Sequence, residues 1–165
     1  VVDLFFKVGG FGDLVNLSSG DDDMLIHKMM KIPGTKVCYN LDKDAVIETA
    51  PVHTWKQLFN QRARWSSNGT NYESKSYILL LTLIYTYYIW MFVSPWCAIF
   101  LDFPWQWCVF SILPKIVVDF VFLSIASWKL KSKRRMLAFL PVELIQIPMI
   151  VFCVPAGISG MFRWK

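Results

Sequence analysis

A long stretch without charged residues constrains this chain more than any other feature. Residues 76–101 contain no Asp, Glu, Lys or Arg. At a rise of about 1.5 Å per residue, a helix over this stretch reaches about 39 Å, which exceeds the roughly 30 Å hydrocarbon core of a bilayer. The whole chain of 165 residues is 55% hydrophobic, well above what a soluble domain needs. The sequence therefore predicts a membrane protein.

Two further apolar stretches follow the first. The second contains Lys115 and Asp119, which lie one helical turn apart and are expected to pair inside a helix bundle. The third contains Glu143 and three prolines between basic flanks, so a kinked span and a re-entrant segment both stay open. The membrane region is thus predicted over 76–165, with spans at about 76–101, 105–128 and 136–162.

The positive charges predict the orientation. Lys75 and the cluster Lys129–Arg135 flank apolar runs and are expected on the cytoplasmic side, while the turn 101–106 lacks Lys and Arg and is expected outside. The net charge of +5 comes largely from such flanking residues, and no basic stripe with interleaved aromatics accompanies it. We therefore predict a multi-pass membrane protein in a lipid bilayer, with no nucleic-acid partner.

Residues 1–75 form the water-facing part, because most of the acidic residues precede Lys75. The pattern over 22–31 predicts a helix with an acidic first turn and a basic last turn, which the helix dipole favours. Residues 35–41 and 45–49 alternate between apolar and polar types, which is typical of strands.

A second water-facing helix is predicted over 55–66. Thr54 and Gln57 have the spacing of a capping box, which marks a helix start. An amide, a guanidinium and an indole then fall three and four residues apart, so they share one face of the helix. These three side chains belong to Gln61, Arg64 and Trp65.

The order of two motifs resembles a known enzyme family. Gly20-Asp21-Asp22 matches the acidic pair of glycosyltransferase family 2, and Gln61, Arg64 and Trp65 match its Q-x-x-R-W motif. Val8-Gly9-Gly10-Phe11 matches the segment that usually precedes the acidic pair. The resemblance covers roughly residues 1–75 and is to membrane-integrated members, such as cellulose and hyaluronan synthases and the ceramide glucosyltransferases.

The resemblance implies an α/β fold for residues 1–75, namely the acceptor-side, C-terminal half of a cytoplasmic GT-A-type domain, followed by α-helical transmembrane segments. It implies inverting transfer of a sugar from a nucleotide-sugar donor, by family habit a UDP-sugar, to a glycan or lipid-linked acceptor. Mg²⁺ or Mn²⁺ is the implied cofactor. Its ligands are expected in the donor-binding half of the family's domain, which has no counterpart here, so we expect a fragment that does not turn over alone.

The resemblance also implies roles for individual residues. Asp22 is the expected general base, with Asp21 and Asp23 as supporting neighbours. A guanidinium pairs well with phosphate oxygens, so Arg64 is expected to hold the donor diphosphate. Trp65 offers a flat apolar face for a sugar ring, and the amide of Gln61 can bind hydroxyls or phosphate.

Two alternatives stay open. Each motif alone is weak, because an acidic helix start usually serves as a solvated cap, and a Q-x-x-R-W string also suits an amphipathic helix beside a membrane. The chain could therefore be a non-catalytic membrane subunit, or a degenerate homologue that binds a glycan or lipid without transfer. The sugar, the acceptor, processivity and any membrane partner subunits are not decided by the sequence.

Overall fold

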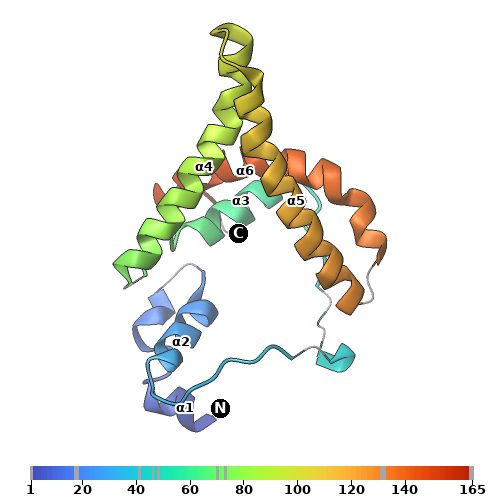
Figure 1. Cartoon of the computed structure of the whole chain (residues 1–165). Helices are drawn as coiled ribbons and strands as arrows, with labels where there is room; N and C mark the ends of the chain where they lie inside the picture. Colours follow the sequence, from blue (N-terminus) through green and yellow to red (C-terminus); the bar gives the residue numbers. More distant parts are fainter. Residues whose placement is uncertain are drawn as a thin grey trace. The chain divides into compact units, whose positions relative to one another are not determined.

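In the computed structural model, every regular element of the described residues is a helix (Figure 1). It describes residues 2–16, 19–40, 42–45, 47, 49–69, 71–72, 74–130 and 133–163. Six α-helices are present there: α1 (Val2–Lys7), α2 (Asp21–Met30), α3 (Trp55–Ser66), α4 (Lys75–Phe100), α5 (Trp105–Lys129) and α6 (Phe139–Ile158). Short 3-10 helices cover Gly12–Asn16, Lys43–Ala45 and Lys133–Ala138.

The predicted α/β fold is wrong, because the described residues contain no strand. Residues 35–40 have no regular structure, and Lys43–Ala45 forms a 3-10 helix. Residues 41, 46 and 48 of the two predicted strands lie outside the described part. A strand persists only when its backbone N–H and C=O groups pair with a neighbouring strand. No described segment supplies that partner, so an alternating pattern alone does not produce a sheet.

The chain divides into two compact units. The first unit consists of Val1–Asn40, Pro51–Ile78 and Val154–Lys165, and it contains α1, α2 and α3. The second unit consists of Leu41–Ala50 and Leu79–Cys153, and it contains most of α4, α5 and α6. We describe each unit separately.

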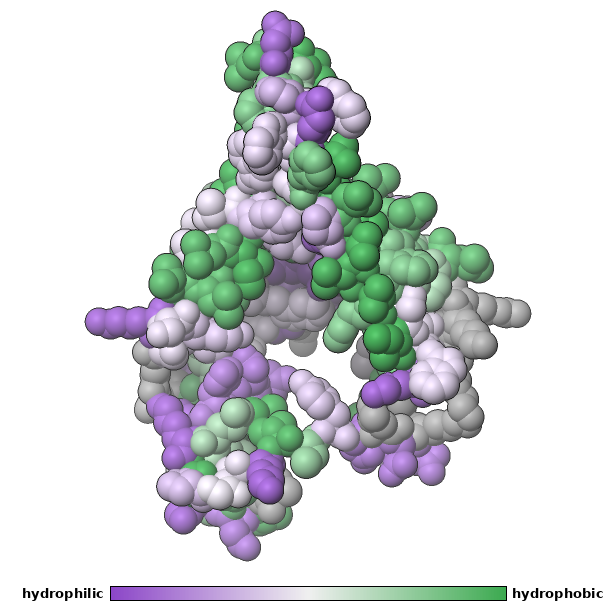
Figure 2. Space-filling model, in the orientation of Figure 1, coloured by the Kyte–Doolittle hydropathy of each residue, from purple (hydrophilic) through white to green (hydrophobic). Residues whose placement is uncertain are grey.

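Three helices are long and apolar enough to cross a membrane, over Lys75–Phe100, Trp105–Lys129 and Met136–Ile158. These bounds begin and end within four residues of the predicted spans. In the second unit, α4 and α5 form a hairpin, in which the Tyr87 hydroxyl donates a hydrogen bond to the Ser111 carbonyl. Apolar side chains cover much of the visible surface of this hairpin (Figure 2). Such a surface suits contact with lipid tails.

In the first unit, α3 begins as the sequence predicts. The Thr54 Oγ1 accepts a hydrogen bond from the Gln57 N–H at 3.2 Å, and the Gln57 Oε1 accepts one from the Thr54 N–H at 3.2 Å. Both halves of the capping box are therefore present, and the predicted helix over 55–66 is confirmed.

The C-terminal end of α6 packs backbone to backbone against α3. Ala63 of α3 is fully buried, with 0% exposure. A Cβ added at Gly157 would lie only 2.3 Å from the Ala63 carbonyl oxygen and 2.9 Å from the Ser67 nitrogen. Farther along, the Arg163 N–H donates to the Asn60 Oδ1 at 3.3 Å. Only glycine fits at position 157, and the contact holds α3 against the last apolar helix.

We expect Gly157→Ala to destabilise the protein by about 1–3 kcal/mol, the usual cost of overpacking. In a helix without this contact the same change stabilises by about 1 kcal/mol, so the sign of the effect is informative. Denaturant unfolding measures it. The matched control is Gly69→Ala, whose Cβ would meet the Ser66 carbonyl oxygen at an ordinary 3.4 Å. A Gly157→Ala protein as stable as the control would contradict the tight contact.

Candidate functional site

The three aspartates form the first turn of α2, which we call the acidic turn (Asp21–Asp23). The predicted helix is thus confirmed, with carboxylates at its start and His27 and Lys28 in its last turn. All three aspartates are exposed. The Asp22 Oδ1 accepts a hydrogen bond from the Asp23 N–H at 2.9 Å, so Asp22 has an oriented carboxylate facing solvent.

The residue before the acidic turn contacts the chain just beyond α3. Gly20 has the left-handed backbone angles φ 73° and ψ 14°, which favour glycine. A Cβ there would lie 3.0 Å from the Nδ2 of Asn68, a residue with only 4% exposure. The Asn71 Nδ2 in turn donates to the Asn68 Oδ1 at 3.2 Å. Because Asn68 follows Trp65 by three residues, this contact brings the acidic turn to the end of the Q-x-x-R-W helix.

A second contact ties the same two segments together. The Tyr72 hydroxyl donates a hydrogen bond to the Asp23 Oδ2 at 2.5 Å, and the His27 Nε2 lies 3.9 Å from the Asp23 Oδ1. Burial, and then the hydrogen bond to Asp23, raise the pKa of Tyr72 well above its usual range. Tyr72 therefore stays protonated and keeps donating. Because Tyr72 lies 49 positions after Asp23, no local pattern in the sequence indicates this contact.

The Q-x-x-R-W residues lie on a helix whose opposite side is anchored. At about 100° per residue, Gln61 and Trp65 each lie about 200° around α3 from Ala63, so they face away from the contact with α6. Gln61 and Arg64 are half-buried, and Trp65 is 48% exposed. The Arg62 guanidinium carbon lies 4.7 Å from the centroid of the Trp65 ring, a cation–π contact that sequence reasoning missed.

The described residues bring together no metal site. No group of three or more His, Cys, Asp or Glu side chains among them could hold a metal ion. The acidic turn supplies neighbouring carboxylates from a single helix start, and the predicted Mg²⁺ or Mn²⁺ ligands are not expected among them. We therefore assign no step to a metal. The predicted ligands belonged to a different part of the family's domain, and that prediction stays untested.

A second polar cluster lies among the apolar helices of the second unit. The Lys115 Nζ lies 3.0 Å from the Asp119 Oδ2, which confirms the predicted pair. It also contacts the Glu143 Oε2 and donates to the Gln146 Oε1 at 3.1 Å. The Lys115 and Glu143 side chains are only 7% and 4% exposed. The Lys115 Nζ lies 5.7 Å from the Tyr88 ring, so the cluster joins α4, α5 and α6.

The three long apolar helices place the chain among membrane proteins. No protein-family model, curated protein or solved structure matches it. The function therefore has to be inferred from the chemistry of the residues described above.

Proposed function

We propose that the protein is an inverting glycosyltransferase that moves a sugar from a nucleotide-sugar donor to a glycan or lipid-linked acceptor at the membrane. The observation that supports this most is the contact of Gly20 with Asn68. Through it, the acidic turn adjoins the end of the Q-x-x-R-W helix, a few residues before the apolar helix α4 begins at Lys75. The proposal thus assigns the base, Asp22, and the phosphate-binding group, Arg64, to the part of the chain that precedes the first membrane helix, α4.

In the proposed reaction, the carboxylate of Asp22 takes the proton from the acceptor hydroxyl. The hydroxyl oxygen forms a bond to the anomeric carbon from the face opposite the leaving group. The bond between that carbon and the diphosphate oxygen breaks, and the nucleotide diphosphate leaves with the electron pair. Asp22 suits this role because it is exposed at a helix start. Asp23 acts as a positioning residue, because its carboxylate holds Tyr72.

The other motif residues serve the donor and the sugar. Arg64 offers a permanently charged, planar guanidinium that stabilises the negative charge developing on the leaving diphosphate. Trp65 offers its exposed ring face to a sugar, while Arg62 occupies the other face. Gln61 lies on the same side of α3 as Trp65 and supplies an amide for hydroxyl or phosphate oxygens.

The test measures nucleotide diphosphate release by the full-length membrane protein from a panel of nucleotide sugars, with Arg64→Lys as the diagnostic variant. We expect Arg64→Lys to lower kcat/KM by about 10- to 100-fold. Lysine keeps the positive charge, but it cannot donate the two parallel hydrogen bonds that a guanidinium makes to phosphate oxygens. The control is Arg62→Lys, two residues from Arg64 on the same helix, which should change kcat/KM by less than about threefold.

Two outcomes would count against the proposal. If Arg64→Lys and Arg62→Lys lowered kcat/KM equally, Arg64 would not be the residue that binds the diphosphate. Absence of release from every donor by a folded wild-type protein would favour a non-catalytic membrane subunit or a degenerate, ligand-binding homologue.

A further inference from the structure

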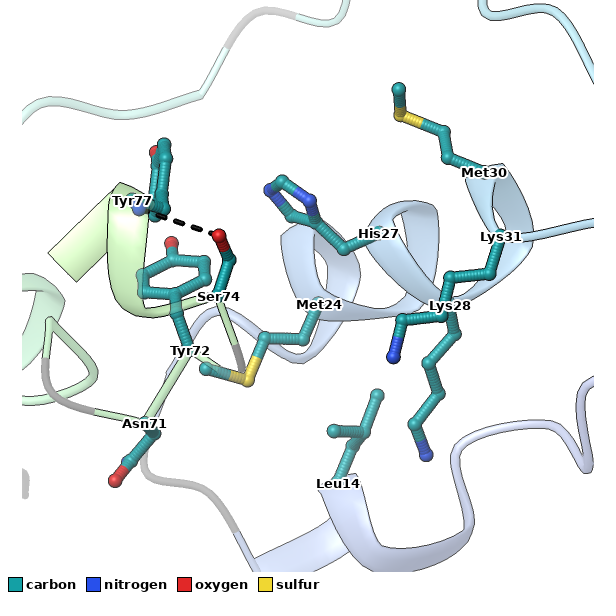
Figure 3. Close-up of a pocket in the computed structure, with 10 residues that line it drawn as sticks. All are labelled: Leu14, Met24, His27, Lys28, Met30, Lys31, Asn71, Tyr72, Ser74 and Tyr77. Carbon is teal, nitrogen blue, oxygen red and sulfur yellow. Dashed lines mark hydrogen bonds between the residues drawn. The ribbon is translucent and has the colours of Figure 1, made fainter.

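Two groups of charged side chains lie outside the residues of the proposed reaction. The first lines a cavity of about 370 Å³ beside α2, where Figure 3 shows Lys28 and Lys31. Lys31 has a further interaction, and Glu73 lies in the lining segment but outside the described residues, so Lys31 does not act as a free cation there. The second group surrounds Lys115 in the second unit, and its contacts join described residues.

The cluster around Lys115 has one ammonium group for two carboxyl groups. The Lys115 Nζ lies 3.0 Å from the Asp119 Oδ2 and also contacts the Glu143 Oε2. The remaining polar members supply an amide and a phenol hydroxyl, with the Gln146 Nε2 donating to the Tyr88 hydroxyl oxygen at 3.5 Å. Within the described part of the chain, no other cation contacts either carboxyl group. The cluster therefore lacks one positive charge.

The two carboxyl groups differ in how far they are enclosed. The Glu143 side chain is only 4% exposed, whereas the Asp119 side chain is 32% exposed. Phe122 and Leu123 follow Asp119 by three and four residues, so they share its face of α5. Both are exposed. Part of the Asp119 carboxyl group therefore opens onto the apolar outer surface of α5.

This opening lies deep in the membrane-spanning part of α5. Asp119 comes 14 residues after Trp105 and 10 residues before Lys129, the two ends of the helix. At about 1.5 Å per residue, these ends lie about 21 Å and about 15 Å away along the helix axis. A roughly 30 Å hydrocarbon core places Asp119 near its middle, beyond the reach of lipid headgroups. Charged groups at such a depth pair with one another or face a bundle interior.

We propose that the outer face of α5 at Asp119 docks a transmembrane helix of a partner subunit, and that this helix carries one lysine or arginine near its middle. Its cation supplies the positive charge that the cluster lacks. A second copy of this chain does not fit, because Lys115 is the one basic residue inside the three apolar spans and its side chain is only 7% exposed. The docking does not depend on the proposed transferase activity, so the two proposals fail separately.

The experiment uses the full-length protein in phosphatidylcholine vesicles. The probe is a synthetic polyleucine helix of membrane-spanning length, with one lysine at its centre and a dansyl group at its end. Energy transfer from the protein's tryptophans to the dansyl group gives the dissociation constant. We expect this peptide to bind at least about tenfold more tightly than a matched peptide with leucine at the centre, because only the lysine peptide can pair with Asp119.

Variants of the protein locate the effect. Asp119→Asn keeps the shape of the side chain but removes the negative charge, so the two peptides should then bind within about threefold of each other. Asp119→Glu keeps the carboxyl group and should retain the preference for the lysine peptide. The control Asp102→Asn changes an exposed aspartate in the turn between α4 and α5 and should bind like the wild type. Asparagine tolerates the positive φ of 51° at that position.

Two outcomes would overturn the docking site. Equal affinity of the folded wild-type protein for the lysine and leucine peptides would mean that Asp119 presents no charge to a partner, because a proton neutralises it or another helix of the full-length protein covers it. A preference for the lysine peptide that survives in Asp119→Asn, as it should in Asp102→Asn, would mean that the peptide binds elsewhere.

Discussion

Replacing Asp22 with asparagine is expected to lower nucleotide diphosphate release by about 10²- to 10⁴-fold, the usual contribution of a general base. This corresponds to about 3–5 kcal/mol in the activation free energy. Asparagine keeps the shape of the side chain and can still accept the hydrogen bond from the Asp23 N–H. It cannot take the proton of the acceptor hydroxyl, so the rate of the chemical step should fall while the protein stays folded.

Two neighbouring variants sharpen this test. Asp44→Asn changes an exposed aspartate outside the acidic turn and should leave release unchanged. Asp21→Asn should lower release by less than about tenfold, because Asp21 is a neighbour of the base and not the base. Thermal unfolding of each variant confirms that it is folded. If Asp22→Asn and Asp44→Asn released nucleotide diphosphate at the same rate, Asp22 would not be the base.

The largest expected effect on stability comes from Lys115→Met. Methionine has a similar length, but it leaves the buried carboxylate of Glu143 without its cation among apolar helices. Removing one partner of a buried ion pair costs about 3–5 kcal/mol, because the remaining charge has no compensation. We expect a loss of this size in the free energy of unfolding, measured by titration with sodium dodecyl sulfate in mixed micelles.

The double variant Lys115→Met/Glu143→Gln tests the cause of that loss. It removes both charges and should recover most of the stability, since the uncompensated carboxylate is gone. Lys129→Met, at the exposed end of α5, should change the stability by less than about 0.5 kcal/mol. A Lys115→Met protein as stable as Lys129→Met would mean that the cluster does not stabilise the helices.

Local signals in the sequence predicted the helices well. The capping box of Thr54 and Gln57 acts within one helical turn, so its geometry follows from spacing alone. The same holds for Lys115 and Asp119, which are four residues apart on one helix. The apolar runs predicted the long helices because length and lack of charge are themselves the requirement for crossing a bilayer.

Contacts between distant segments could not be predicted in this way. Glu143 lies 28 residues from Lys115, and Tyr72 lies 49 residues from Asp23, so neither pair leaves a periodic pattern. The strand prediction for 35–41 and 45–49 failed for a related reason. Alternation describes one strand, whereas a sheet depends on partners elsewhere in the chain. The roles of Asp22, Gln61, Arg64 and Trp65 remain predictions that rest on motif chemistry.

The contact between Gly157 and Ala63 has a consequence for biosynthesis. The two residues are separated by 94 positions, and two long apolar helices and nearly all of the third are translated between α3 and Gly157. At about 5–20 residues per second, the ribosome supplies Gly157 several seconds after Ala63. The helix that carries Gln61, Arg64 and Trp65 therefore acquires its packing partner only after the last apolar helix has been made. The packing of α3 against Gly157 can therefore form only after nearly all of the membrane segments have been translated.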